Sequence, residues 1–177
     1  MTTQLVEVWE QFQFILKRYG RVYSSLNPPC SPDQILTAGS LNNVAFPEAL
    51  ISLLCLNNGQ QIGNEGIKLG IFKSFSGWDV YKRHLFLGMD EIETAYQTFI
   101  SDPVLLSEFG KNEIPFAVAG NPTQFSEAFC IHLLTGAVSL IWTEYVDPFN
   151  PPEWQVQKFH RAETLTKFIA KQIELYQ

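Results

Sequence analysis

The stretch Leu26–Gln60, LNPPCSPDQILTAGSLNNVAFPEALISLLCLNNGQ, carries the densest set of helix signals in the chain. Ser31 is followed three residues later by Gln34, which is the spacing of a capping box, where each side chain accepts the backbone amide of the other residue. Pro32 stands at the first helical position, where a missing amide is tolerated. The sequence therefore predicts a short helix that begins at Ser31.

A second helix start follows within the same stretch. Pro47 suits the first turn of a helix, and Glu48 adds a negative charge near its positive end. The body over Ala49–Leu56 is apolar on nearly all sides, which indicates a buried helix. Gly59 is predicted to close it, because glycine readily adopts the left-handed conformation at a helix end.

This order of motifs, with a Pro-Pro step, a short capped helix, an apolar-Pro-acidic helix start and the sequence Asn-Asn-Gly-Gln, resembles the SUKH superfamily. Further points of similarity are Trp9 in a long first helix, the step Leu87–Ile92 with its acidic residues, and the late strands within Phe116–Trp142. The superfamily includes fungal regulators of cell-wall (glucan) assembly and many bacterial proteins. The resemblance covers most of the chain.

The resemblance implies a non-enzymatic protein-binding module. Bacterial members are understood largely as immunity proteins, which bind and neutralise toxins, often nucleases. A regulatory scaffold in cell-wall synthesis is the fungal alternative, although the fungal regulators carry long disordered arms that this sequence does not show. The expected partner is a basic toxin domain.

Composition agrees with one folded domain over residues 1–177. The apolar fraction is 46% and the charged fraction 17%, which argues against disorder. The net charge of −6 lacks the basic footprint of a nucleic-acid-binding protein. An acidic surface instead favours basic protein partners.

The chain shows no targeting or membrane signal. Its first residues, MTTQLVEVWEQ, have no basic region and no cleavage site, so no signal peptide is expected. The longest apolar run is too short to cross a bilayer, so we expect no membrane association. Three widely spaced cysteines, Cys30, Cys55 and Cys130, are typical of reduced thiols, which indicates a cytoplasmic protein.

Periodicity places the remaining elements. Helices are predicted over Thr3–Val22, Asp90–Ile100 and Ala162–Tyr176, and strands over Ile67–Phe75, Val80–Leu87, Glu113–Ala119, Ala128–Leu134 and Ala137–Trp142. Asp90 and Glu93 are a candidate cap pair, and Pro103 to Gly110 is interpreted as an irregular link. The fold class predicted is α+β, a single domain with a mostly antiparallel sheet packed against N-terminal and C-terminal helices.

A search for catalytic patterns finds none. There is no G-x-S-x-G turn for a serine nucleophile, and no pair of histidines or cysteines has a zinc-binding spacing. His84, His132 and His160 are each interpreted as structural, and no metal or cofactor is expected. The alternative is a small hydrolase with a non-contiguous site, such as His132 with Asp147, which would show a deep pocket and a strongly shifted pKa.

The predicted partner-binding site lies within Glu65–Tyr81. Trp78 and Tyr81 are aromatic residues of the kind that anchor interfaces, and Asp79 and Glu65 supply acidic attraction for a basic partner. Glycines in this segment indicate loops, which commonly carry binding residues. The alternative is that Trp78 fills the core from a turn, since tryptophan is highly buried on average.

Overall fold

In the part of the chain that the structure describes, six antiparallel strands form one sheet in which the spatial order follows the chain order, β1-β2-β3-β4-β5-β6. The computed structural model describes residues 3–31, 33–35, 46–61, 70–74, 82–145 and 154–177. The strands are β1 (Phe72–Lys73), β2 (Arg83–Phe86), β3 (Glu113–Asn121), β4 (Gln124–His132), β5 (Val138–Tyr145) and β6 (Trp154–Ala162). The α+β class and the antiparallel sheet predicted from the sequence are confirmed.

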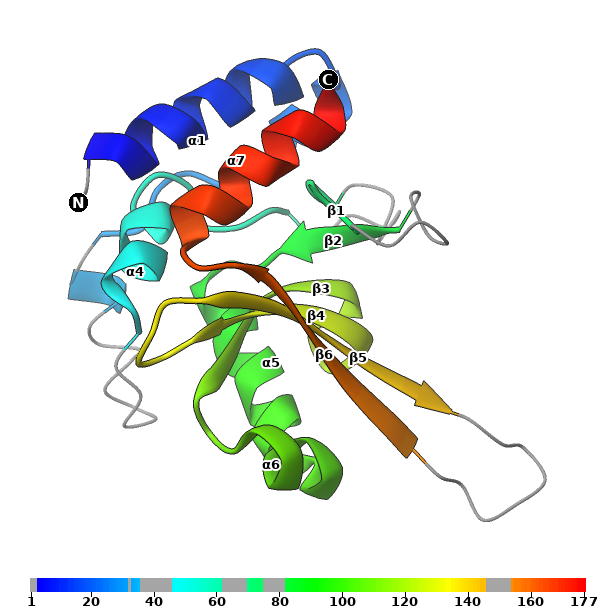
Figure 1. Ribbon diagram of the computed structural model, residues 1–177. Helices are drawn as coiled ribbons and strands as arrows, with labels where there is room; N and C mark the ends of the chain where they lie inside the picture. The colour runs from blue at the N-terminus through cyan, green and yellow to red at the C-terminus, as the bar shows by residue number, and fades with distance from the viewer. Residues whose placement is uncertain (1–2, 32, 36–45, 62–69, 75–81, 146–153) are drawn as a thin grey trace.

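Helices cover both faces of this sheet (Figure 1). They are α1 (Thr3–Leu16), α2 (Gly20–Ser24), α4 (Glu48–Leu54), α5 (Met89–Ser101), α6 (Pro103–Phe109) and α7 (Leu165–Tyr176). The first and last helices, α1 and α7, lie together on one side, and α5 and α6 lie on the other. The N-terminal and C-terminal helices therefore pack together on one side of the sheet.

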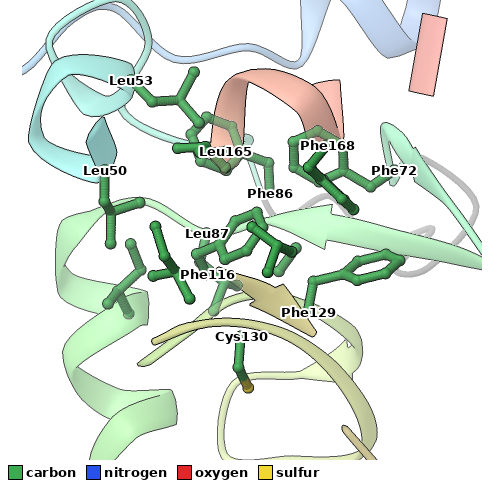
Figure 2. Packing of buried hydrophobic residues seen from close by; sticks show 14 of the residues in the cluster. Leu50, Leu53, Phe72, Phe86, Leu87, Phe116, Phe129, Cys130, Leu165 and Phe168 are labelled. Carbon is green, nitrogen blue, oxygen red and sulfur yellow. The ribbon is translucent and has the colours of Figure 1, made fainter. Parts of the chain in front are cut away.

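Aromatic rings fill the layer between α7 and the sheet. Phe168 of α7 makes edge contacts with Phe72, Phe116 and Phe129, at ring-centroid distances of 5.3, 5.6 and 4.8 Å. Figure 2 shows Phe168 directed from α7 towards the sheet, while Cys130, next to Phe129 on β4, points to the opposite side. This alternation buries β4 on both faces, because helices cover each side of the sheet.

The side chain of Gln172 closes the outer edge of the sheet at β1. It is fully buried on α7, where its Oε1 accepts the Lys73 amide at 2.8 Å and its Nε2 donates to the Lys73 carbonyl at 3.1 Å. An amide side chain offers one donor and one acceptor, like a neighbouring strand. Gln172 thereby satisfies the backbone amide and carbonyl of Lys73 at this edge of the sheet.

The helix starts predicted in Leu26–Gln60 are confirmed. The Ser31 amide donates to Gln34 Oε1 at 2.9 Å, and the Gln34 amide donates to Ser31 Oγ at 3.2 Å, which is the reciprocal capping box. Pro47 occupies the N-cap position of α4, which begins at Glu48, and Leu50, Leu53 and Leu54 of this helix are fully buried.

Gly59 does not close α4, contrary to the prediction. The helix ends at Leu54, and Gly59 lies further on with φ +70°. A Cβ at this position would lie 2.0 Å from the Gly88 nitrogen and 2.4 Å from the Leu87 carbonyl carbon. Glycine is thus required here by its positive φ and by the close passage of two backbone segments.

Around Gly59, residues 57–60 connect segments that are distant in the sequence, and we call these four residues the Asn57–Gln60 junction. Asn57 Oδ1 accepts the Trp9 indole N–H at 2.9 Å, and Asn58 Oδ1 accepts the Met89 amide at 2.8 Å. Gln60 Oε1 accepts the amides of Ile71 and Phe86. The junction therefore holds α1, β1, β2 and the start of α5 against the chain that follows α4.

The end of the first helix and the cap of α5 differ from the prediction. The first helix ends at Leu16 and a separate helix, α2, begins at Gly20, because Tyr19 adopts non-helical angles. Asp90 and Glu93 do not cap α5. The N-cap residue is Gly88, which has no side chain to accept a backbone amide. The Met89 amide is instead satisfied by Asn58, which the sequence places far away.

Two elements were missed altogether. The residues after Pro103 form α6, in which Asp102 Oδ1 accepts the amides of Val104 and Leu105 and Pro103 occupies the first turn. Residues 154–162 form β6, which pairs with β5 along its whole length. Of the predicted strands Ile67–Phe75 and Val80–Leu87, the described residues form β1 and β2, and residues 67–69 and 75–81 lie outside the described residues.

All three cysteine thiols are free. Burial raises the pKa of the Cys30 and Cys55 thiols, and it raises the pKa of the fully buried Cys130 well above its usual value. Thiolate formation is disfavoured at each position, so the thiols contribute to packing as small apolar groups.

Candidate partner-binding surface

The four residues predicted to bind a partner lie outside the described part of the chain. Glu65 falls within residues 62–69, and Trp78, Asp79 and Tyr81 fall within residues 75–81. These assignments, and the alternative that Trp78 fills the core, stay predictions. The structure does describe the base of the second segment, where the Ser74 amide donates to the Lys82 carbonyl at 3.0 Å.

A buried ionic group lies beside this base, and we call it the Glu127 cluster. Glu127 of β4 is 5% exposed. Its carboxylate lies 2.6 Å from Lys82 Nζ, 3.0 Å from His84 Nε2 and 3.4 Å from Ser74 Oγ. The cluster therefore ties β4 to the two ends of the connection between β1 and β2.

The cluster has the electrostatics of a structural ion pair. Burial alone would raise the pKa of Glu127, but its contacts with His84 and Lys82 outweigh burial and lower that pKa to about 2. A carboxylate with this pKa is ionised at neutral pH and is a weak general base. His84 is completely buried against Phe129, so its ring is closed to a substrate.

The histidine of the hydrolase alternative has a structural role in the turn between β4 and β5. His132 Nδ1 accepts the amides of Leu134 and Thr135, both at 3.3 Å. Asp147, the partner considered for it, lies outside the described residues. Within the described residues, no group of three or more His, Cys, Asp or Glu side chains could hold a metal ion. No described helix is both long and apolar enough to span a membrane.

A candidate for binding is the side of the molecule formed by α5 and α6. A shallow depression on α5 is lined by hydroxyl, amide and acidic side chains: Asp90, Glu93, Thr94, Gln97, Thr98 and Ser101. These positions recur every three or four residues, so they form one continuous stripe along the helix. The opposite stripe of α5, which contains Ile92, Tyr96 and Phe99, is buried against the sheet.

A second hollow, of about 410 Å³, continues from this stripe through Thr98 and Asp102. It lies where α6 faces β4, β5 and β6, and Val104, Leu105, Phe125 and Val156 contribute apolar side chains to its lining. No Lys or Arg lines either hollow among the residues that the structure describes. We refer to the stripe and this hollow together as the α5–α6 surface.

Sequence reasoning missed the α5–α6 surface because two of its parts were not recognised as elements. The helix α6 was interpreted as an irregular link, and β6, which supplies Val156, was not predicted. The signal for α6 was present in Asp102-Pro103, which is a capping residue followed by proline in the first turn. The contact of α6 with the outer strands has no local sequence signal.

Comparison with known proteins does not extend these observations. No protein-family model matches the chain, and no curated protein matches its sequence.

Proposed function

We propose that this chain is a non-enzymatic protein-binding module that neutralises a basic toxin domain in the cytoplasm, the role of the bacterial immunity proteins it resembles. The observation that supports the proposal is the α5–α6 surface. It combines an acidic stripe with an apolar hollow and has no lining cation among the described residues. Interfaces commonly pair a buried apolar anchor with charges around it.

The two parts of this surface would act at different stages of binding. Asp90 and Glu93 would attract a basic domain and speed its approach, because charges around an interface act mainly on the association rate. The hollow between α6 and the outer strands would accept one apolar or aromatic side chain of the partner. The net charge of −6 means that the whole molecule would also attract a basic partner.

The proposal is tested with the reading frames that adjoin the gene for this chain. Each is expressed alone and together with this protein, and cell growth is measured. We expect one frame to be toxic alone, to be tolerated when this protein is present, and to form a stable complex with it. If none is toxic, or if toxicity persists without complex formation, the proposal is wrong.

Charge reversal then locates the surface. The double substitution Asp90→Lys, Glu93→Lys should slow association by roughly tenfold at low salt, and the difference should shrink as salt is added. The matched control is Glu174→Lys, which reverses an exposed charge on α7, on the other side of the sheet.

The residues predicted from the sequence provide a competing location. Asp79→Lys and Trp78→Ala should weaken binding if the partner contacts residues 75–81. If these variants bind normally while the α5 variant does not, the α5–α6 surface is the site. The reverse result would assign binding to the segment predicted from the sequence.

A further inference from the structure

The exposed side of α1 carries an ordered set of charges around one aromatic residue. Glu7, Glu10 and Phe14 follow one another at intervals of three or four residues on α1, so they lie in one stripe, and Arg18 follows four residues later in the turn after Leu16. Phe14 is 64% exposed, although phenylalanine is usually buried. The stripe therefore reads acidic, aromatic and basic in chain order.

A hollow of about 580 Å³ lies next to Phe14, between α1 and α7. Ile15 and Ile173 contribute apolar side chains to it, and Glu7, Glu10 and Arg18 contribute charged ones. Phe14 thus stands beside a space that an aromatic side chain could enter. A large exposed apolar side chain beside such a space, with charged groups around both, is typical of an interaction surface.

We infer that this stripe of α1 is an interface between two copies of this chain. A twofold axis through Phe14 would place two α1 helices antiparallel, with each Phe14 next to the hollow of the other copy. Glu10 lies four residues before Phe14, about 6 Å along the helix axis, and Arg18 lies four residues after Phe14, in the turn that continues α1. Glu10 of each copy would then face Arg18 of the other.

The path of the chain after α1 keeps Arg18 in a position to make this contact. The Arg18 amide donates to the Ile15 carbonyl at 3.0 Å, and the Tyr19 amide donates to the Leu16 carbonyl at 2.8 Å, so a tight helical turn continues beyond Leu16. Arg18 is exposed. Its neighbour Lys17 instead lies 5.4 Å from the centre of the Tyr23 ring in the same chain.

The charge order identifies a second copy as the occupant. A uniformly basic partner would be attracted by Glu7 and Glu10 but repelled by Arg18. A uniformly acidic partner would be attracted by Arg18 but repelled by the two glutamates. A twofold interface requires that each half of one surface complements the other half of the same surface. Glu10 and Arg18, four residues before and after Phe14 in the sequence, meet that requirement.

This inference is independent of the proposed function. Figure 1 places α1 and α7 on the side of the sheet opposite to α5 and α6. A dimer formed through α1 would leave the α5–α6 surface of both copies open. Evidence against one proposal would therefore not count against the other.

Sedimentation equilibrium over micromolar to millimolar concentrations tests the inference. The wild type should self-associate reversibly. Glu10→Arg and Arg18→Glu should each weaken the dimer by roughly tenfold or more, because two attractive pairs become repulsive. An equimolar mixture of the two variants should restore association as a heterodimer, and the double variant Glu10→Arg, Arg18→Glu should restore the homodimer.

The apolar part of the interface has its own variant and control. Phe14→Ala should weaken the dimer, whereas Leu134→Ala, which removes an 82% exposed leucine from the β4–β5 turn, should not. Thermal unfolding checks that every variant is folded. A wild type that stays monomeric at every concentration overturns the inference, and so does a dimer that the charge reversals leave unchanged or that their mixture fails to restore.

Discussion

The Asn57–Gln60 junction and the Glu127 cluster both join segments that are distant in the sequence, but they use different forces. The junction relies on backbone contact at Gly59 and on neutral amide side chains such as Gln60. The cluster relies on the ionised carboxylate of Glu127 with Lys82 and His84 around it.

This difference determines how each region responds to its surroundings. Neutral hydrogen bonds and close packing depend little on pH, whereas an ion pair holds only while its groups are charged. Mutations in the junction should therefore destabilise the protein equally at all pH values. Loss of the Glu127 cluster should lower the free energy of unfolding at neutral pH but not in acid.

The largest expected effect comes from Gly59→Ala. The added Cβ would collide with the backbone of Leu87 and Gly88, and the residue would also be held at a positive φ. We expect a loss of more than about 4 kcal/mol in the free energy of unfolding, or failure to fold. Urea denaturation monitored by tryptophan fluorescence measures it.

Gly136→Ala is the matched control, because it changes a glycine of nearly the same φ, +69°, where a Cβ meets nothing within 4 Å. It should cost only the backbone strain, about 1 kcal/mol. If the two variants were equally destabilised, contact at Gly59 would not be what holds the junction.

Truncation of the helix that precedes the junction should have the next largest effect. Leu53 of α4 is fully buried, so Leu53→Ala should reduce the free energy of unfolding by about 2–5 kcal/mol. The deficit should be the same at pH 7 and pH 4, because no charge is involved. Leu134→Ala should stay within about 0.5 kcal/mol of the wild type. A nearly neutral Leu53→Ala would contradict the organising role of this stretch.

The Glu127 cluster should show the opposite dependence on pH. The pKa of Glu127 is lowered from 4.5 to about 2, so the folded state favours the ionised carboxylate. The stabilisation is complete above the unfolded pKa and is lost as the pH falls from about 4.5 to about 2. It amounts to at most about 3 kcal/mol.

Glu127→Gln isolates this contribution. The difference in unfolding free energy between wild type and variant should be large at pH 7 and should shrink as the pH falls through that window. Denaturation curves at a series of pH values provide the measurement. A difference that did not change with pH would mean that the charge of Glu127 does not stabilise the fold.

The features that the sequence predicted correctly depend on residues close together in the chain. The capping box of Ser31 and Gln34, the start of α4 at Pro47 and the apolar runs of β3 and β4 all express interactions or alternation within a few positions. Such patterns are visible without knowledge of the tertiary structure.

The features that the sequence did not predict depend on distant partners or on exposure. The N-terminal amide of α5 is satisfied by Asn58, 31 residues before it. The strand β6 shows no apolar run, because Gln155, Lys158 and Phe159 are exposed on an outer strand. The α5–α6 surface needs α6 and β6 together, so it could not be found before both were known.

The smallest expected change in stability tests which residue caps α5, and therefore whether the Asn57–Gln60 junction stabilises this helix. Asn58 Oδ1 accepts the Met89 amide at 2.8 Å, whereas Asp90, the cap predicted from the sequence, is exposed within the first turn of α5. Asn58→Ala should therefore lower the free energy of unfolding by about 1 kcal/mol, the usual effect of removing a helix cap. Asp90→Ala removes only a favourable charge near the helix start and should change it by less than about 0.5 kcal/mol. Paired denaturation curves at high salt, where the charge term of Asp90 is screened, make the distinction sharper. If Asp90→Ala lowered the free energy of unfolding as much as Asn58→Ala or more, Asp90 would be the residue that caps α5. The junction would then stabilise only α1 and the first two strands.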